Sequence, residues 1–158
     1  MSNEIQLKTT INGIEYDLMV PARLLASDFL RDNLNLTGTH VGCEHGICGS
    51  CTIKIDGLTA RSCLKFAVQL DGKKVETVES FKEKPETRNI LEKFKAHHSL
   101  QCGFCTPGFL MIIDELLKSK IKFSENEIRE ALSGNLCRCT GYENIIKAAK
   151  EILAQKVI

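Results

Sequence analysis

The first twenty residues alternate between apolar and polar positions. The segments 5–11 and 14–20 place an apolar, aromatic or β-branched side chain at every second residue, and Asn12-Gly13 stands between them. Alternation with a period of two is typical of a strand with one buried face, and Asn-Gly is a strong signal for a hairpin turn. The pattern therefore predicts that the chain opens with a β-hairpin, whose second strand ends at Pro21.

The spacing of apolar residues then changes from that of a strand to that of a helix. An amphipathic helix lying across the sheet is predicted from Leu24, Leu25, Phe29, Leu30 and Leu34. After a cysteine-rich loop, 51–55 and 58–63 read as two strands joined by the turn Asp56-Gly57, and 75–78 as a further short strand. Two strands, a helix and then more strands in a single sheet are the order of a β-grasp fold.

The composition shifts again after this last strand. The segment 79–87 is rich in Lys, Glu, Ser and Pro and contains a single apolar residue, Phe81, which indicates a linker. Beyond it, apolar residues recur at helical spacing and predict four helices of similar length. These helices are expected at about 88–98, 107–119, 124–132 and 145–153.

Two of these helices carry recognisable start signals. Thr106 is predicted as the N-cap of the second helix, with Pro107 at its first position, where the missing N–H costs nothing. Ser124 and Glu127 form a capping box at the start of the third. The chain is thus predicted to be an α+β protein with a β-grasp domain over residues 1–80, a linker over 81–87 and an all-α four-helix-bundle domain over 88–158.

Composition excludes several classes of function. A hydrophobic fraction of 43% and a charged fraction of 26% are ordinary for a globular protein, and a net charge of +1 leaves no electrostatic footprint for nucleic acid. No apolar run approaches the roughly 18 residues of a membrane span, and the N-terminus lacks the features of a signal peptide, so a cytoplasmic protein is expected. Eight cysteines in a reducing compartment favour metal or redox chemistry over disulfides, which stay a minor alternative.

The first cysteine group lies in one glycine-rich loop. Cys43, Cys48 and Cys51 follow the spacing C-x4-C-x2-C, and Cys63 comes after eleven further residues. This is the plant-type ferredoxin spacing, in which four thiolates hold a 2Fe-2S cluster. Zinc sites usually pair their ligands as two short units, so the distribution of three and one argues against zinc. The N-terminal domain is therefore predicted to be plant-type ferredoxin-like.

The second cysteine group is divided between two segments. Cys102 and Cys105 precede one predicted helix, and Cys137 and Cys139 precede another. The positive end of a helix dipole lowers the pKa of a nearby thiol and favours the thiolate, which is the ligand form. The spacing alone leaves both an iron–sulfur cluster and zinc open, because a C-x2-C pair with a distant second pair also resembles zinc ligation.

The segments 101–108 and 133–142 decide between these possibilities by resemblance. They read QCGFCTPG and SGNLCRCTGY, and closely resemble the small iron-sulfur subunit of the molybdenum hydroxylases, the xanthine oxidase family. The resemblance spans the whole chain and implies one 2Fe-2S cluster in each domain. It assigns the distal cluster to Cys43, Cys48, Cys51 and Cys63, the cluster nearer molybdenum to Cys102, Cys105, Cys137 and Cys139, and an approach to the pterin cofactor to Gln101 and Cys139.

The resemblance also implies partner chains. In that family a large subunit binds molybdopterin and a medium subunit binds FAD, and this chain contains no GxGxxG or P-loop motif of its own. The implied role is a relay in a heterooligomer, from the molybdopterin centre through two clusters to FAD or an external acceptor, without catalysis by this chain alone. The segment 60–64, ARSCL, is similar to the aldehyde and carbon monoxide members of the family, and this similarity favours an aldehyde substrate. Carbon monoxide, an N-heterocycle or an aromatic acyl-CoA are the alternatives.

Two other readings have to be weighed against the relay. A zinc-stapled interaction module would use the same eight cysteines, and a free-standing ferredoxin would need nothing after Ser80. The histidines favour neither alternative. His97 and His98 are adjacent rather than three or four residues apart and are expected to be exposed, and His45 is expected to be a solvated loop residue.

Overall fold

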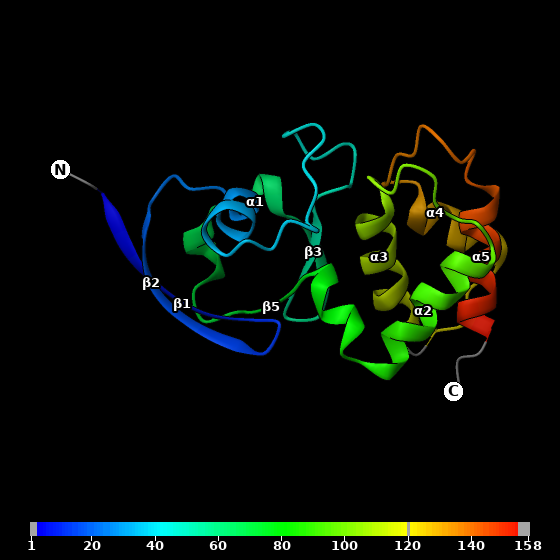
Figure 1. Cartoon of the computed structure of the whole chain (residues 1–158), viewed down its shortest axis with the longest axis horizontal. Helices are drawn as coiled ribbons and strands as arrows, with labels where there is room; N and C mark the ends of the chain where they lie inside the picture. Colours follow the sequence, from blue (N-terminus) through cyan, green and yellow to red (C-terminus); the bar gives the residue numbers. More distant parts are fainter. Residues whose placement is uncertain (1–2, 120, 155–158) are drawn as a thin grey trace.

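The N-terminal half of the chain is built on one mixed sheet of five strands (Figure 1). In the computed structural model, residues 3–119 and 121–154 are described. The strand order is β2-β1-β5-β3-β4, in which β1 and β5 are parallel and the other neighbours antiparallel. The strands are β1 Glu4–Ile11, β2 Ile14–Pro21, β3 Thr52–Ile55, β4 Leu58–Arg61 and β5 Lys74–Glu76.

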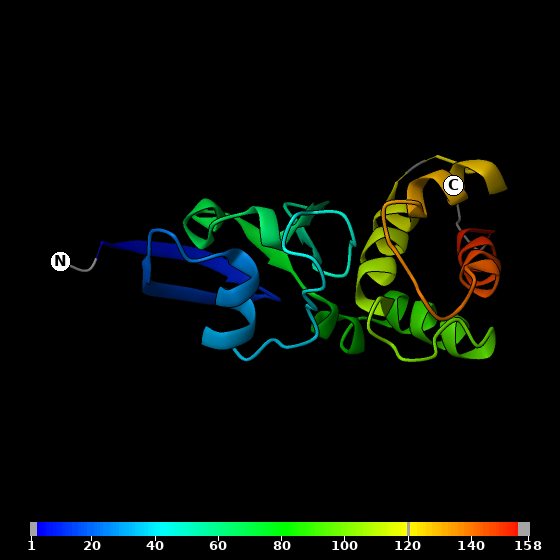
Figure 2. The same cartoon turned by 90° about the horizontal axis from the view of Figure 1, so that it is seen from above.

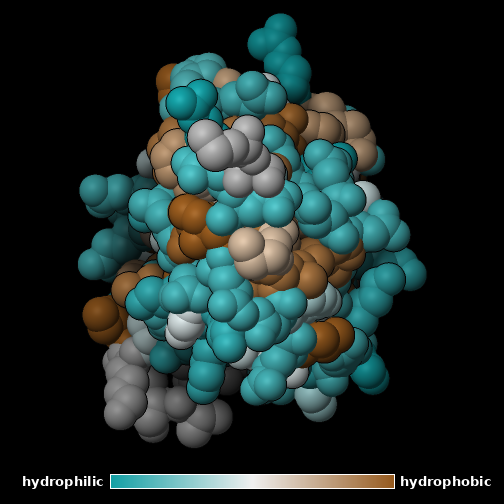
Figure 3. All heavy atoms as spheres, turned by 90° about the vertical axis from the view of Figure 1, so that its left-hand side faces the viewer, coloured by the Kyte–Doolittle hydropathy of each residue, from teal (hydrophilic) through white to brown (hydrophobic). Residues whose placement is uncertain are grey.

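The predicted N-terminal hairpin is confirmed. β1 and β2 pair along their whole length up to Ile11 and Ile14, and β2 ends at Pro21. Asn12 and Gly13 have φ angles of 52° and 84°, as a tight turn between twisted strands requires. Figure 3 views the sheet end of the molecule, where hydrophobic areas are interrupted by hydrophilic residues.

The predicted helix after the hairpin is shorter and less regular than its spacing indicated. It consists of α1 Ala26–Asp28 followed directly by a π-helical turn, η1 Phe29–Asn33. Its apolar side chains lie on one face of the sheet, and the 3-10 turn η3 Ala67–Leu70 covers that face beside it. The buried core of this half contains Leu7, Ile11, Val20, Ala26, Phe29, Leu30, Ile53, Ala67, Leu70 and Val75.

Two strand predictions were wrong at their ends. The strand expected to run to Cys63 stops at Arg61, and Cys63 lies in the 3-10 turn η2 Ser62–Leu64. The Ser62 N–H and hydroxyl both donate to the carbonyl oxygen of Cys51, at 3.2 and 2.8 Å. The chain then turns away, with the Lys65 N–H donating to the Ser62 carbonyl oxygen at 3.3 Å. The strand expected over 75–78 is Lys74–Glu76, because Val78 already begins the 3-10 helix η4 Val78–Lys82.

The C-terminal half is helical and has its own hydrophobic core, so the α+β class is confirmed. Buried side chains of all four α-helices contribute to this core. Ser124 and Glu127 form the predicted capping box. Thr106 was wrongly predicted as an N-cap: Cys105 holds that position, and the Thr106 hydroxyl is buried with no partner among the described residues. The helices are α2 Pro85–Ala96, α3 Thr106–Lys118, α4 Glu125–Leu132 and α5 Glu143–Ala154.

The segment expected as a linker is ordered. Phe81 belongs to η4 and is 1% exposed within the helical core, and α2 begins at Pro85 rather than at Arg88. Thr87 is also buried, and its hydroxyl donates to the carbonyl oxygens of Phe81 and Lys84 at 2.8 and 3.0 Å. The connection is therefore attached to the helical half. Among the described residues, no helix combines the length and apolar character that crossing a membrane requires.

Candidate metal centres

The loop between η1 and β3 carries the first three cysteines. Glu44, Gly46 and Gly49 have φ angles of 57°, 82° and 77°, so the backbone turns repeatedly within a few residues. The N–H of Cys48 donates to the Cys43 sulfur at 3.4 Å. This amide, together with those of His45 and Ile47, lowers the pKa of Cys43 to about 6. The loop thus favours the thiolate, which is the form that binds a metal.

Cys63 completes this group from the 3-10 turn that follows β4, close to Cys51 at the start of β3. Both Cys63 and Cys51 are buried, at 3% and 1% exposure, and their side chains interact. Burial raises the pKa of Cys63 to about 11, and the neighbouring Cys51 adds to the shift. Two buried thiols side by side disfavour charge on both, so this half of the group fits a bound cation that removes both protons.

The second cysteine group is assembled from two loops, before α3 and before α5. The Cys139 and Cys102 sulfurs lie 3.5 Å apart, and the Cys105 and Cys137 side chains interact. Burial raises the pKa of Cys105 to about 12. For Cys137 burial acts in the same direction, but it is outweighed by hydrogen bonds that include the Thr140 hydroxyl at 3.1 Å, and the pKa is lowered.

This second group reaches the surface on one side. Cys102, Cys139 and the predicted cofactor neighbour Gln101 are exposed, whereas Cys105 is buried. Tyr142 holds the inner part of the loop, since its hydroxyl accepts the N–H of Cys137 at 3.0 Å. The side of the group that contains Cys102 and Cys139 is therefore open to solvent.

The loops that carry the two groups lie on the same side of the molecule, along the upper edge in Figure 1, and they contact each other. Figure 2 shows them from above. The N–H of Leu136, next to Cys137, donates to the carbonyl oxygen of Cys48 at 2.9 Å. A Cβ atom on Gly49 would lie 2.6 Å from the Gly134 carbonyl oxygen, so the backbones approach as closely as glycine permits. The sequence analysis missed this contact, although the glycines were a visible signal for it.

Gly108 and Asn135 fill the centre of this contact. A Cβ atom on Gly108 would overlap the Asn135 side chain and the Gly49 carbonyl oxygen. Asn135 is fully buried, and neither of its side-chain polar atoms has a partner among the described residues. Arg61 ties the same region to the sheet, because its Nη2 donates to the Gly134 carbonyl oxygen at 2.8 Å.

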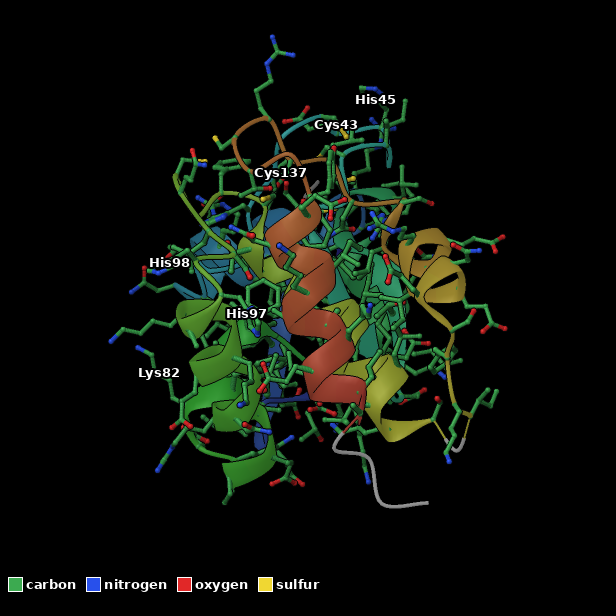
Figure 4. The ribbon with its side chains drawn as sticks, turned by 90° about the vertical axis from the view of Figure 1, so that its right-hand side faces the viewer. Cys43, His45, Lys82, His97, His98 and Cys137 are labelled. Atoms are coloured by element: carbon green, nitrogen blue, oxygen red, sulfur yellow. The ribbon has the colours of Figure 1, made fainter. Side chains whose placement is uncertain are left out.

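The histidines that the sequence analysis singled out differ in their positions. His45 is exposed, as predicted, and its Nδ1 lies against the carbonyl oxygen of Cys43. Figure 4 shows Cys43, His45 and Cys137 toward one end of the molecule and His97, His98 and Lys82 away from it. His98 is exposed, but the expectation for His97 was wrong: it is half-buried, because its Nε2 pairs with Glu151 at 2.5 Å.

The donor chemistry fits two iron–sulfur clusters. The thiols of each group approach one another in pairs, and amide and hydroxyl donors are directed at two of the sulfurs, as is typical of cluster ligands. Among the described residues, no three His, Cys, Asp or Glu side chains converge on a position that would hold a single metal ion. The thiol donors are thus compatible with a cluster, and similarity to known proteins identifies what they bind.

Two protein-family descriptions cover most of the chain. Residues 33–99 match a 2Fe-2S iron-sulfur cluster binding domain, and residues 77–150 match a 2Fe-2S binding domain. The fold and its two cysteine groups therefore define a protein with two 2Fe-2S binding domains. The zinc alternative is set aside by these matches.

Relatives extend the match over nearly the whole chain. It is 51% identical over 155 residues to caffeine dehydrogenase subunit gamma of Pseudomonas sp. (strain CBB1), covering 96% of this chain and 92% of the relative. It is 46% identical over 154 residues to the nicotine 6-hydroxylase small subunit of Paenarthrobacter nicotinovorans, covering 98% and 93%. The structure matches quinoline 2-oxidoreductase from Pseudomonas putida 86 with a TM-score of 0.89 at 44% identity, covering 99% and 100%. The chain belongs to the small iron-sulfur subunits of the molybdenum hydroxylases, the xanthine oxidase family.

Proposed function

We propose that this chain relays electrons within a heteromeric molybdenum hydroxylase, using its two cysteine groups as cluster sites. Cys43, Cys48, Cys51 and Cys63 hold one 2Fe-2S cluster, and Cys102, Cys105, Cys137 and Cys139 hold the other. The observation that carries this proposal is the direct contact between the two loops, where Leu136 donates to Cys48 at 2.9 Å. Each cluster, when bound, takes up and releases one electron at a time.

The residues of the chain itself supply position, hydrogen bonds and exclusion of water. Burial of Cys51, Cys63 and Cys105 keeps solvent from the inner side of both groups. The N–H of Cys48 and the hydroxyl of Thr140 each donate to a ligand sulfur. Hydrogen bonds to sulfur and solvent exposure are the features by which a protein tunes the reduction potential of such clusters.

The direction of the relay follows from exposure. Cys102, Cys139 and Gln101 lie on the open side of the second group, so this side faces the molybdopterin of a large partner subunit. The first group then passes electrons to FAD on a medium subunit or to an external acceptor. The relatives named as a small subunit and as subunit gamma support assembly with further chains.

The substrate belongs to the complex rather than to this chain. The sequence analysis favoured an aldehyde, with an N-heterocycle among the alternatives. Two of the relatives described above are named for caffeine and nicotine and the matching structure for quinoline, all N-heterocyclic compounds. We therefore favour an N-heterocycle. A division into a first domain over 1–80 and a four-helix-bundle domain is part of this proposal, with Phe81 and α2 from Pro85 assigned to the bundle rather than to a connection over 81–87. A cytoplasmic location remains a prediction.

Analysis of the purified full chain tests the relay. Two 2Fe-2S centres correspond to about four irons and four acid-labile sulfides per chain. The chain alone should accept electrons from a strong chemical reductant and oxidise no substrate, whereas the assembled complex should turn over an N-heterocycle. Zinc in place of iron, or turnover by the isolated chain, would refute the proposal. If the complex turned over an aldehyde and no N-heterocycle, only the proposed substrate class would be refuted.

A further inference from the structure

A fully buried lysine lies between the two halves of the molecule. Lys54 is on β3, and its Nζ pairs with Asp114 on α3; both side chains are 0% exposed. Glu76 on β5 forms a second ion pair with this lysine, with its Oε2 3.4 Å from the same Nζ. Along β3, Ile53 belongs to the core beneath the sheet, so Lys54 projects from the opposite face, toward α3.

The outer members of this charge cluster are exposed to solvent. Lys118 lies one helical turn beyond Asp114 and contacts its Oδ2 at 2.9 Å, and Lys84 contacts Glu76 at 2.7 Å. Lys118 and Lys84 are 45% and 41% exposed. The Oδ1 atom of Asp114 has no partner among the described residues. The Lys54–Asp114 pair is therefore shielded from water, and one Asp114 oxygen has no partner among the described residues. The outer lysines, by contrast, are solvated.

Such a pair contributes little to stability by itself. Removing two charges from water is costly, and replacement of a buried ion pair by apolar side chains of similar size is often neutral or stabilising. The best attested use of a buried polar pair is to select one register between packed elements. Lys54 and Asp114 join two such elements, because β3 and α3 contact each other directly (Figure 1).

The two joined elements each begin at a proposed cluster ligand. β3 starts at Thr52, directly after Cys51, and α3 starts at Thr106, directly after Cys105. Close to these starts, Gly49 and Gly108 already touch. The ion pair adds a second attachment further along both elements. Two separate attachments along one strand and one helix restrict the angle between them more than a single attachment does.

We propose that Lys54 and Asp114 are positioning residues that hold β3 and α3 at one angle and thereby fix the separation of the two clusters. This inference rests on the proposed relay. Its expected signature is not the presence of either cluster but the interaction between the two. The magnetic interaction of two reduced clusters depends on their separation, so it appears as a splitting in the electron paramagnetic resonance spectrum of the fully reduced chain.

The decisive variant replaces both partners, Lys54→Met with Asp114→Leu, in the full chain carrying both clusters. We expect an unfolding temperature equal to or above that of the unaltered protein, because no buried charge is left unpaired. We also expect the loss of a single resolved splitting, replaced by a broad distribution, since an apolar contact no longer selects one angle. Unchanged splitting in this folded double variant would overturn the inference.

Three further variants keep the test interpretable. Lys54→Arg retains a charged partner for Asp114 and should keep a resolved splitting. Lys118→Met removes an exposed charge beside Asp114 and should leave the splitting unchanged. If the double variant does not fold, Asp114→Asn, which preserves shape, should broaden the splitting, and a sharp splitting there counts against the inference. Absence of any cluster signal in the unaltered chain would instead refute the proposed function.

Discussion

In the first cysteine group three of the four sulfurs come from the segment 43–51, whereas the second group is gathered from two loops that precede separate helices. The first depends on local backbone turns at Gly46 and Gly49 and on amides directed at Cys43. The second depends on how α3 and α5 pack. A cluster site formed by one loop and a cluster site formed by tertiary packing are expected to respond differently to the same kind of substitution or treatment.

The two groups also differ in access. The loop group buries Cys51 and Cys63, whereas the helical group exposes Cys102 and Cys139 beside Gln101. In the proposed relay both groups exchange electrons with a partner outside the chain, so each needs a side that is not buried. Cys102 and Cys139 form that side in the helical group, and the less buried Cys43 and Cys48 form it in the loop group.

The largest expected effect comes from removing one ligand from each group. Cys48→Ser should abolish or perturb the spectroscopic signal of one cluster and Cys105→Ser that of the other, because a hydroxyl is a poor substitute for a soft thiolate ligand. Electron paramagnetic resonance of each reduced variant measures this directly. Loss of both signals from either folded variant would show that the two sites are not independent.

The difference in exposure predicts an order of cluster loss. When the full chain is kept in air with an iron chelator and without partner subunits, the cluster of the exposed group should disappear first, because Cys102 and Cys139 are accessible. The two signals are followed over time in one sample. Addition of the large subunit should slow the loss of that cluster alone. Equal rates of loss would contradict the assignment of the open side.

The contact between the groups predicts a stability effect that distinguishes two glycines. Gly108→Ala should destabilise the protein by about 1–3 kcal/mol, because the new methyl group meets the Gly49 backbone and the buried Asn135. Gly134→Ala is the matched control, since its methyl group meets only the end of the Arg61 side chain, at 2.9 Å. Thermal unfolding measures both. Equal effects would mean that the loops are less tightly joined than the structure indicates.

Features encoded by neighbouring residues were predictable from the sequence. The Asn12-Gly13 hairpin turn and the capping box at Ser124 depend on local chemistry, and both are present in the structure. Features that depend on distant parts of the chain were not. Phe81 looked like a solitary apolar residue in a linker, yet it fills the helical core. The local pattern also did not indicate that Lys54 is buried against α3.

The cysteine groups fall between these cases. Spacing indicated which thiols belong together, because ligand spacing follows from the size of the bound group. It did not indicate that β4 ends at Arg61 and that Cys63 lies in the 3-10 turn Ser62–Leu64 that follows. It also gave no sign that Asn135 would be buried between the two loops, because that contact forms only when the sheet and the helices meet.

The smallest expected effect is a shift of one potential without loss of a cluster. The hydroxyl of Thr140 donates to the Cys137 sulfur at 3.1 Å, and such a bond stabilises the reduced, more negative cluster more than the oxidised one. Thr140→Val should therefore lower the potential of the second cluster and leave that of the first unchanged. A net hydrogen bond of about 1 kcal/mol corresponds to roughly 40 mV for one electron. Redox titration followed by electron paramagnetic resonance reports each cluster separately, and Thr140→Ser, which keeps the hydroxyl, should restore the original value. An equal shift of both clusters would indicate that Thr140 acts through the contact between the loops rather than through its own sulfur.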